Sequence, residues 1–352
     1  MSAIFDIMRA FDCEELHFCR DRATGLRAIV AIHDTRLGAI TSGGARLVDY
    51  PDEEAALGDA LRLSQAMTQK CAACGAGLGG AKAVIWNRPD QKTPALLEAF
   101  GRFVLHLGGR FRTAVDYGLS HDDGRVIKNV CPYIEGESAA GDGFENEADT
   151  TALGLITAME LAAAAMLGRV GLSGLTVAVQ GVGYVGRFLV DFLVQAGARV
   201  LAADVDPAVL ARLTQDHPQV AILPPEDILA APCDILAPCA LGGALNPHSI
   251  ARLRCTIICG AANNQLLEPA RDAALLSERG IFYLPDFIVN AGGIIQACVE
   301  IAQGTKAEAV DRAQSIIGRN VQKILAEAER GVPPLAAALA IVQEALAAAE
   351  AC

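Results

Sequence analysis

One glycine-rich segment restricts the fold of this chain more than any other. Residues 176–206 read TVAVQGVGYVGRFLVDFLVQAGARVLAADVD, in which an apolar run leads to Gly181, Gly183 and Gly186 and then to an amphipathic stretch. An apolar run that passes through a Gly-x-Gly-x-x-Gly turn into a helix is typical of a mononucleotide-binding β-α-β unit. Gly181 permits the tight turn, Gly183 lets the backbone approach a pyrophosphate, and Gly186 lets the helix pack on the sheet.

The acidic residue at the end of this segment indicates which cofactor would bind. Asp204 follows the second apolar run, 18 residues after Gly186. A carboxylate there would accept hydrogen bonds from the adenosine ribose hydroxyls and repel a 2′-phosphate, so it favours NAD over NADP. The alternative is a packing turn that binds no nucleotide, and the complete strand-turn-helix context argues against it. Three further residues of the turn are expected at the cofactor: Val182, Tyr184 and Val185.

The second half of the chain predicts a doubly wound parallel sheet. Helical or turn segments separate most of a series of short apolar runs, near 176–180, 199–203, 234–237, 256–259 and 281–284. Strands that alternate with helices at this spacing form a parallel sheet. The end of the chain is predicted to be helical over 307–330 and 334–351, with a break at the Gly-Val-Pro-Pro sequence between them.

The length of 352 residues predicts two domains, because it exceeds what a single core usually holds. In the first half, strand-like runs at 26–33 and 83–86 alternate with helical stretches near 57–70 and 94–107. Residues 136–150 are small, polar and acidic, as in a linker or a loop that lines a cleft.

These boundaries give an α/β chain of two domains. The nucleotide-binding Rossmann domain is expected over 141–331. An N-terminal α/β domain for substrate binding and catalysis is expected over 1–140, together with the last helix at 332–352.

Composition and charge exclude several classes of function. The net charge is −12, and no basic patch is visible, which argues against a nucleic-acid partner. No apolar run reaches the roughly 18 residues that a membrane helix needs, and the N-terminus lacks the features of a signal peptide. The 11 cysteines are irregularly spaced and are expected to be reduced thiols in a cytoplasmic protein. The expected partners are therefore small molecules and further copies of the chain.

The segment 70–82, KCAACGAGLGGAK, admits three interpretations. A phosphate-binding loop of the Walker type fails, because Ala83 follows Lys82 where a serine or threonine is needed. Cys71 and Cys74 could form a redox or metal pair, but no second pair follows at a metal-ligand spacing, so buried thiols are the better explanation. The third interpretation is that Lys70 and Lys82 direct two charges at one small ligand.

Seven segments together resemble one family, the glutamate, leucine, phenylalanine and valine dehydrogenases, among which the leucine dehydrogenases are the most similar group. They occur in the family's order and span nearly the whole chain: AIHDTRLGAITSGGARL (31–47), AMTQKCAACGAGLGGAK (66–82), RTAVDYG (112–118), the glycine segment at 181–186, CDILAPCALGGALN (233–246), GAANNQL (260–266) and PDFIVNAGGIIQ (285–296).

The resemblance implies a reaction and three residues that carry it. The reaction is the reversible NAD-dependent oxidative deamination of an L-amino acid to a 2-oxo acid and ammonia, which needs no metal. Lys70 would pair with the substrate carboxylate, and Lys82 would act on the water that attacks the iminium carbon. A lysine does so only when burial and a neighbouring cation disfavour its charged form. Asp116 would move protons to and from the amine. The family's habit also implies a homo-oligomer.

The resemblance further predicts an apolar substrate of the leucine or valine type. Glutamate dehydrogenases of the family have a lysine before the Gly-Gly-x-Arg motif, and here Ser42 stands there, so an acidic side chain would lack a partner. An aromatic or unusual L-amino acid is the first alternative, because one methylene shifts preference by only roughly 1–3 kcal/mol. A NAD-binding protein without turnover is the second. The remaining substrate-site positions are Gly43, Gly44, Met67, Ala114, Ile294 and Ala297.

The resemblance assigns further residues to the cofactor, three of them at its nicotinamide end: Thr151, Asn263 and Asn290. Ala240 and Ala262 lie in the same matching segments and complete the predicted cofactor site.

Several polar residues are given structural roles. His33 and His121 do not cluster, and Asp122 and Asp123 are expected to start a helix or form a turn rather than bind a metal. The acidic stretch 145–149 is interpreted as a solvated hinge, with a role at the cleft entrance as the alternative.

Overall fold

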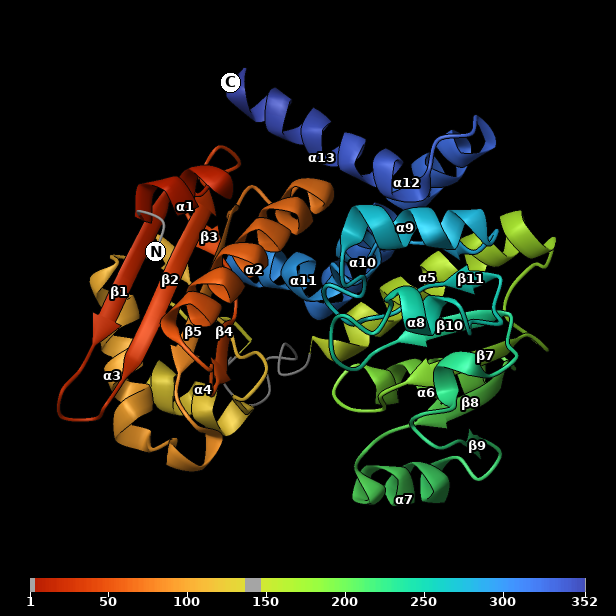
Figure 1. The fold of residues 1–352 in the computed structure, drawn as a ribbon, viewed down its shortest axis with the longest axis horizontal. Coiled ribbons are helices and arrows are strands. Elements are labelled where there is room, and N and C mark those ends of the chain that lie inside the picture. The colour runs from red at the N-terminus through yellow and green to blue at the C-terminus, as the bar shows by residue number, and fades with distance from the viewer. Residues whose placement is uncertain (1–3, 137–146, 352) are drawn as a thin grey trace. The chain divides into compact units, whose positions relative to one another are not determined.

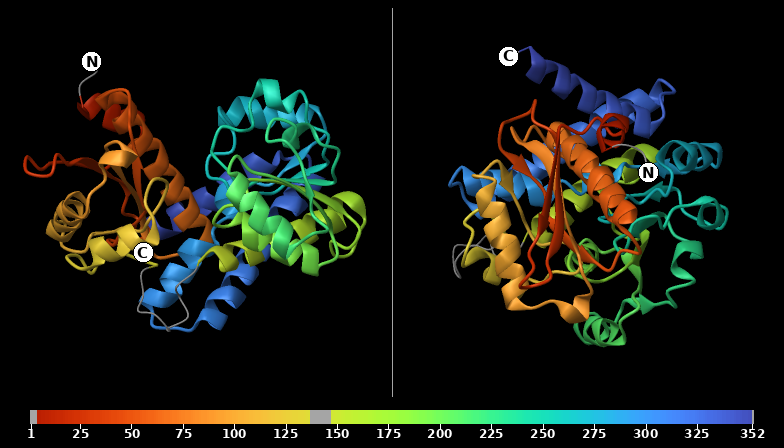
Figure 2. Two further views of the ribbon diagram at one scale, coloured as in Figure 1. Left: turned by 90° about the horizontal axis from the view of Figure 1, so that it is seen from below. Right: turned by 60° about the vertical axis from the view of Figure 1, so that its left-hand side comes forward.

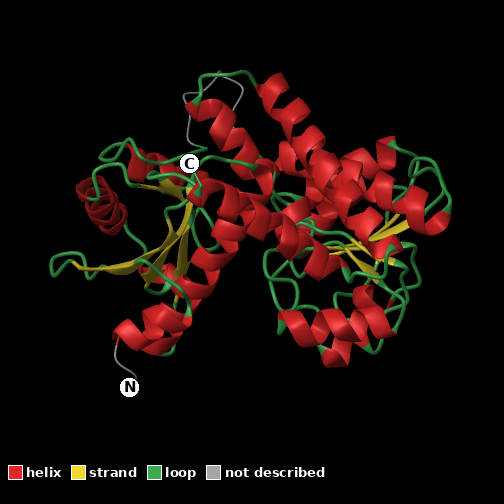
Figure 3. Ribbon diagram, turned by 90° about the horizontal axis from the view of Figure 1, so that it is seen from above, coloured by secondary structure: helices red, strands yellow, loops and turns green. Residues whose placement is uncertain are grey.

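The computed structural model describes residues 4–136 and 147–351 (Figure 1). Its contacts divide the chain into two compact units, Met1–Glu145 with Val342–Cys352, and Asn146–Ile341. Each unit contains one six-stranded sheet with helices beside it (Figure 3).

The sheet of the first unit combines antiparallel and parallel strands. Its order is β1-β2-β5-β3-β6, with β4 also beside β5. β1 and β2 are antiparallel, as are β2 and β5, whereas β3 and β4 run parallel to β5. The strands are β1 (Glu15–Arg20), β2 (Arg27–Asp34), β3 (Thr41–Ser42), β4 (Ala45–Val48), β5 (Gly79–Trp86) and β6 (Phe111–Arg112).

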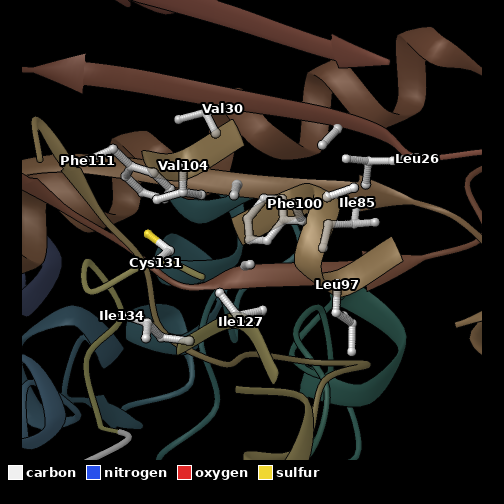
Figure 4. Close-up of a cluster of buried hydrophobic side chains, with 14 of the residues drawn as sticks. Leu26, Val30, Ile85, Leu97, Phe100, Val104, Phe111, Ile127, Cys131 and Ile134 are labelled. Carbon is white, nitrogen blue, oxygen red and sulfur yellow. The ribbon is translucent and has the colours of Figure 1, made fainter. Parts of the chain in front are cut away.

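Successive side chains of β5 point to opposite faces of the sheet, and both faces are covered by helices. Ala81, Ala83 and Ile85 point into a core closed by α3 (Pro94–His106) and α4 (His121–Lys128), where Phe100 and Ile127 are fully buried (Figure 4). Residues between them, such as Val84, face the opposite side, against α2 (Glu53–Cys74), which Figure 2 shows as the long orange helix. Lys82 has the same parity as Val84, so it lies on the α2 face.

The glycine-rich segment before Lys82 is a strand rather than a loop. β5 begins at Gly79, four residues before the predicted start. A Cβ at Gly80 would lie 2.1 Å from Thr68 Oγ1, so α2 and the strand are in close contact here. α2 is also longer than expected: Asp52 caps its start, and Gly75 ends it in the left-handed conformation.

The second unit is a doubly wound parallel sheet, which confirms the predicted fold class. The strand order is β12-β11-β10-β7-β8-β9, and every pair is parallel. The order reverses between β7 and β10, the position at which such sheets bind ligands. The strands are β7 (Thr176–Gln180), β8 (Arg199–Ala203), β9 (Ala221–Ile222), β10 (Ile235–Pro238), β11 (Ile257–Ile258) and β12 (Phe282–Tyr283).

Helices lie on both faces of this sheet (Figure 3). α5 packs against α6, α11 and α12, and Lys306 of α12 bonds to Asp149 of α5 at 2.7 Å. The helices are α5 (Ala148–Leu167), α6 (Gly186–Gln195), α7 (Pro207–Asp216), α8 (Pro247–Ile250), α9 (Pro269–Glu278), α10 (Asp286–Val289), α11 (Gly292–Ile301) and α12 (Lys306–Glu329). α13 (Pro334–Glu350) follows, and from Val342 it belongs to the first unit, where Glu350 pairs with Arg36.

α5 corrects the expectation that no apolar segment is long enough for a membrane helix. By length and composition α5 could cross a bilayer, and it is the one such helix in the described chain. Half of its most apolar window is buried inside the protein, where Leu155 and Met159 are fully covered. A buried core helix reaches this hydropathy because neighbouring protein, rather than lipid, surrounds its apolar side chains.

Residues 145 and 146 of the acidic stretch 145–149 lie outside the described residues. The boundary expected between the two domains, at 140 and 141, lies outside them as well. Glu147 precedes α5, and Ala148 and Asp149 form its first turn. The ten cysteines in the described chain form no disulfide bonds with one another, and Cys71 and Cys74 are buried in the last turn of α2.

Candidate functional site

Lys82 and Asp116 form an ion pair on the α2 face of the first unit. Lys82 Nζ lies 2.6 Å from Asp116 Oδ2, and the lysine side chain is 6% exposed. Asp116 lies in the segment after β6, which backbone bonds hold beside β4: Ala45 donates to Ala114 and Leu47 donates to Tyr117. Two predicted catalytic residues that are 34 positions apart are thus brought into contact.

Gly44 makes this contact possible, because its missing side chain leaves room for the pair. A Cβ at Gly44 would lie 3.1 Å from the Asp116 Cβ and 3.4 Å from Lys82 Nζ. At the preceding Gly43 a Cβ would lie 1.7 Å from the Ala81 carbonyl oxygen, so no side chain fits there. The Gly-Gly pair between β3 and β4 therefore lets the backbone pass close to β5 and to the two charged side chains.

A second cation, which sequence reasoning did not assign to the site, contacts the same carboxylate. Arg46 Nε lies 3.4 Å from Asp116 Oδ2, and Arg46 Nη1 lies 3.4 Å from Asp59 Oδ2. The Tyr50 hydroxyl donates to Asp59 Oδ2 at 2.6 Å. The sequence signal for Arg46 was its place in the Gly-Gly-Ala-Arg motif, whereas Asp59 and Tyr50 carry no signal of their own.

The charges around Asp116 determine its protonation. Burial alone would raise the pKa of Asp116, but the Lys82 and Arg46 charges and the Lys82 hydrogen bond outweigh it and hold that pKa well below its usual range. For Arg46 burial likewise acts against the charged form, and the Asp116 and Asp59 carboxylates reverse this and raise its pKa. Asp116 is therefore ionised in this arrangement.

The other predicted substrate residues of the first unit belong to α2, to β3 and to the segment after β6. Met67 and Lys70 follow Asp59 by 8 and 11 positions in α2, so helical geometry places all three on one flank of that helix. Ser42 is buried in β3, and Ala114 lies two residues before Asp116. Ile294 and Ala297 are buried in α11 of the second unit.

The glycine turn of the second unit has the geometry expected of a phosphate site. Gly181 has a φ of 89°, and a Cβ there would lie 2.9 Å from Ala240. A Cβ at Gly186, the first residue of α6, would lie 2.0 Å from the Gly181 carbonyl oxygen. At Gly183 a Cβ would meet no protein atom within 4 Å. Packing thus accounts for the first and third glycines, whereas no contact within the described residues requires the second.

Asp204 lies directly after β8 and is bonded to the same turn. Its Oδ2 accepts the Val182 N–H at 2.8 Å, and its Oδ1 accepts the Asp206 N–H at 2.9 Å. Tyr184 is exposed, and Val185 is the N-cap residue that precedes α6. A carboxylate has about four acceptor positions, so Asp204 keeps capacity for ribose hydroxyls.

The predicted nicotinamide-end residues are partly brought together. Asn290 Nδ2 donates to Asn263 Oδ1 at 2.9 Å and to the Ala261 carbonyl at 3.0 Å. Asn290 Oδ1 is buried and has no hydrogen-bond partner among the described residues. Ala262 is buried beside them. Thr151 is buried in α5, and its hydroxyl group donates a hydrogen bond to the Glu147 carbonyl at the start of that helix.

Two residues given structural roles make structural contacts. The His33 ring bonds to Thr68 and to the Phe11 carbonyl, which fixes β2 beside α2. Asp123 forms a capping box with Ser120 at the start of α4, so Asp122 and Asp123 begin a helix as expected. His121 is the first residue of that helix. No group of three metal-ligating side chains occurs within residues 4–136 and 147–351.

Comparisons with known proteins match both units. Residues 14–130 match the family model for the Glu/Leu/Phe/Val dehydrogenase dimerisation domain, and residues 208–351 match the model for Glutamate/Leucine/Phenylalanine/Valine dehydrogenase. Leucine dehydrogenase of Bacillus subtilis is 40% identical over 97% of this chain and 93% of that protein. Valine dehydrogenase of Streptomyces albus is 40% identical over 96% and 93%. The crystal structure of L-tryptophan dehydrogenase from Nostoc punctiforme superposes with a TM-score of 0.80 at 35% identity, covering 99% of this chain and 100% of that one.

Proposed function

The chain belongs to the glutamate/leucine/phenylalanine/valine dehydrogenase family, and from this premise we propose that it deaminates branched-chain L-amino acids oxidatively, with NAD as the hydride acceptor. The products are the 2-oxo acid and ammonia, and the reaction is reversible. The observation that carries the proposal is the buried Lys82–Asp116 pair beneath Gly44, in a chain 40% identical to leucine and valine dehydrogenases.

A dehydrogenase of this family uses a nicotinamide cofactor, which accepts the hydride from the substrate Cα. The residues present fit such a group. The turn at Gly181 and Gly183, followed by the start of α6, offers backbone N–H groups to a pyrophosphate. The unpartnered Asn290 Oδ1 is a ready acceptor for the N–H of a carboxamide. Asp204 supports NAD over NADP in this proposal, because its carboxylate would repel a 2′-phosphate.

Three residues of the first unit would carry the chemistry on the substrate. Lys70 would hold the α-carboxylate through its ammonium charge. Lys82, in its neutral form, would accept a proton from the water that attacks the iminium carbon. Asp116 would move protons at the substrate nitrogen, and it can do so only when the hold of Lys82 and Arg46 on its carboxylate weakens, because that hold disfavours protonation.

Two kinds of observation support an aliphatic substrate. The relatives at 40% identity act on leucine and valine by name, so the aromatic alternative is not favoured. Ser42 is buried and uncharged, so an acidic substrate side chain beside it would be desolvated without a counter-charge. The further predicted substrate positions also carry apolar side chains: Met67 and Ala114 in the first unit, and Ile294 and Ala297 in the second.

We also propose a homo-oligomer that works in the cytoplasm. Residues 14–130 match a domain model described as a dimerisation domain, which supports self-association. The ten described cysteines are free thiols, as in a reducing compartment.

The reaction can be tested by its stoichiometry. The purified chain is incubated with L-leucine or L-valine and NAD at alkaline pH, and NADH, ammonia and the 2-oxo acid are measured together. The proposal predicts equal amounts of all three, and no products from D-leucine. NADH formed without ammonia would mean that a different reaction takes place.

A further inference from the structure

Two cysteines of the second unit lie side by side where β10 and β11 begin. The register of these parallel strands pairs Ile235 with Ile257. Cys233 and Cys255 come two residues before that pair, one on each segment. The Cys233 N–H donates to the Arg254 carbonyl at 3.2 Å, so the two backbones are still adjacent here. Neighbouring strands are about 4.8 Å apart, within the range of about 4.4–6.8 Å between the Cα atoms of a disulfide.

The side chains of the two cysteines are also in contact. A hydrogen bond joins the thiols of Cys233 and Cys255. Both side chains pack against the same hydrophobic core, which includes Leu253 and Leu276. Neither cysteine is fully covered, since both residues are only partly buried. The two sulfur atoms are therefore close to each other and within reach of a small solute.

A neighbouring cation favours the thiolate of one member of the pair. Arg279, the C-cap residue of α9, donates from its guanidinium group to the carbonyls of Ile250 and Leu253. The hydrogen bond from Cys233 lowers the pKa of Cys255, and the charge of Arg279 lowers it further against the opposing effect of burial. The same hydrogen bond raises the pKa of Cys233. Cys255 is therefore the thiol that ionises first.

A second pair of cysteines near the same two strands lacks these features and serves as an internal comparison. Cys239 follows β10 and Cys259 follows β11. Burial raises the pKa of Cys239 to about 12, and it raises the pKa of Cys259 as well. A thiol that stays protonated is a poor nucleophile, so this second pair should react more slowly.

We propose that Cys233 and Cys255 form a reversible disulfide when the protein meets hydrogen peroxide. The Cys255 thiolate attacks one peroxide oxygen, the O–O bond breaks, and the hydroxide released takes up the proton that Cys255 had lost. The sulfenic acid left on Cys255 is then attacked by the Cys233 sulfur. The S–S bond forms, the S–O bond breaks, and the second hydroxide takes the Cys233 proton. The thiols lose two electrons, and the peroxide becomes two molecules of water.

This disulfide would lie at the end of the sheet opposite the predicted cofactor turn. Gly181 follows β7 and Asp204 follows β8, whereas the two cysteines precede β10 and β11. All four strands are parallel, so residues before them and residues after them lie at opposite edges. The bond should therefore leave the cofactor turn open. It should also stabilise the second unit, because it closes a loop of the unfolded chain.

The test uses the full-length reduced chain, hydrogen peroxide as the oxidant, and peptide mass spectrometry after alkylation of the remaining thiols. The chain should lose two of its 11 thiols, and dithiothreitol should restore both. Fragmentation of the linked peptides should place the bond between Cys233 and Cys255. A bond between Cys239 and Cys259 instead, or oxidation of other cysteines while the first pair is still alkylated, would overturn the inference.

Four variants separate the roles of the residues. Cys233→Ser should stop at the sulfenic acid of Cys255, which dimedone traps, whereas Cys255→Ser should lose the fast reaction. Arg279→Gln should slow the first step by roughly threefold, because fewer Cys255 side chains are ionised. Cys19→Ser is the matched control, since Cys19 is also partly buried but lies in β1, and it should form the disulfide as the wild type does. Equal oxidation rates in Cys255→Ser and the wild type would contradict the assignment of the attacking thiol.

A second readout tests the consequence of the bond and does not depend on turnover. The oxidised wild-type chain should unfold at a temperature several degrees above that of the reduced chain, and Cys233→Ser should show no such difference. A fluorescence titration with NADH should give the same dissociation constant before and after oxidation. An unchanged unfolding temperature, or loss of NADH binding on oxidation, would contradict a stabilising bond at the edge away from the cofactor turn.

Discussion

The ammonium group of Lys82 and the carboxylate of Asp116 lie 2.6 Å apart, next to Gly44, where a Cβ would lie 3.1 Å from the Asp116 Cβ and 3.4 Å from Lys82 Nζ. Arg46 and Asp59 lie beside the pair and add one positive and one negative charge to it. Its position explains why the Gly-Gly-Ala-Arg segment, the second lysine and the Asp116 loop occur in one chain.

Replacing Lys82 by Ala should abolish turnover while cofactor binding stays near normal. The variant lacks the group that would accept a proton from the attacking water, which is worth about 10²–10⁴-fold in rate. NAD binding depends on residues of the second unit, so a fluorescence titration with NADH should give a dissociation constant close to that of the wild type. Loss of NADH binding would show that Lys82 has been assigned to the wrong site.

Replacing Gly44 by Ala should lower kcat strongly, because the new methyl group would press on both Asp116 and Lys82. Gly58→Ala is the matched control. Gly58 lies inside α2, and a Cβ there meets no atom within 4 Å, so this change should stabilise the helix by about 0.5–1 kcal/mol and leave kcat unchanged. Steady-state rates and thermal unfolding of both variants check this, and equal kcat values in both would contradict it.

The acid sensitivity of the fold should depend on Asp116. Its folded-state pKa is lowered from the ordinary 3.8, so its ionised form stabilises the native state above about pH 4, and this contribution is lost as the pH falls below that value. Asp116→Asn should therefore be less stable than the wild type at pH 7, and the difference should shrink towards pH 3. Urea unfolding at both pH values measures it. A difference that is independent of pH would mean that Asp116 contributes through packing only.

Removing the charge of Asp204 should relax cofactor choice. Asp204→Asn keeps an oxygen for the Val182 N–H but no longer repels a 2′-phosphate, so the ratio of kcat/KM for NAD to that for NADP should fall by about tenfold. Asp206→Asn is the control, since Asp206 caps α7 two residues further on. An unchanged ratio in Asp204→Asn would remove this carboxylate from cofactor selection.

The parallel sheet and its nucleotide turn could be predicted because their signals are local. The first two apolar runs, the glycine spacing and Asp204 all lie within 31 residues, and β7, β8 and α6 formed close to where they were expected. The strands of the first unit were less predictable. β3 and β6 have two residues each, too few to show a period, and they form because neighbouring strands supply hydrogen-bond partners, β5 for β3 and β3 for β6.

The candidate site could be predicted only in part, for a similar reason. Lys82 and Asp116 stood out because their motifs resemble a known family, but Asp59 and Tyr50 lie in ordinary helical and turn sequence. Their contact with Arg46 joins α2 to β4 through side chains alone, and such contacts leave no pattern in the sequence. The buried helix α5 shows the opposite effect, since its composition alone cannot distinguish a protein core from a membrane.

The measurement that tests the proposed function most directly is kcat/KM for NAD reduction with each of the twenty protein L-amino acids at alkaline pH. Leucine, valine and isoleucine should give the highest values, and glutamate and aspartate should give essentially none, because Ser42 offers no counter-charge. Turnover mainly on phenylalanine or tryptophan, or no turnover on any apolar amino acid, would contradict the assignment of a branched-chain substrate.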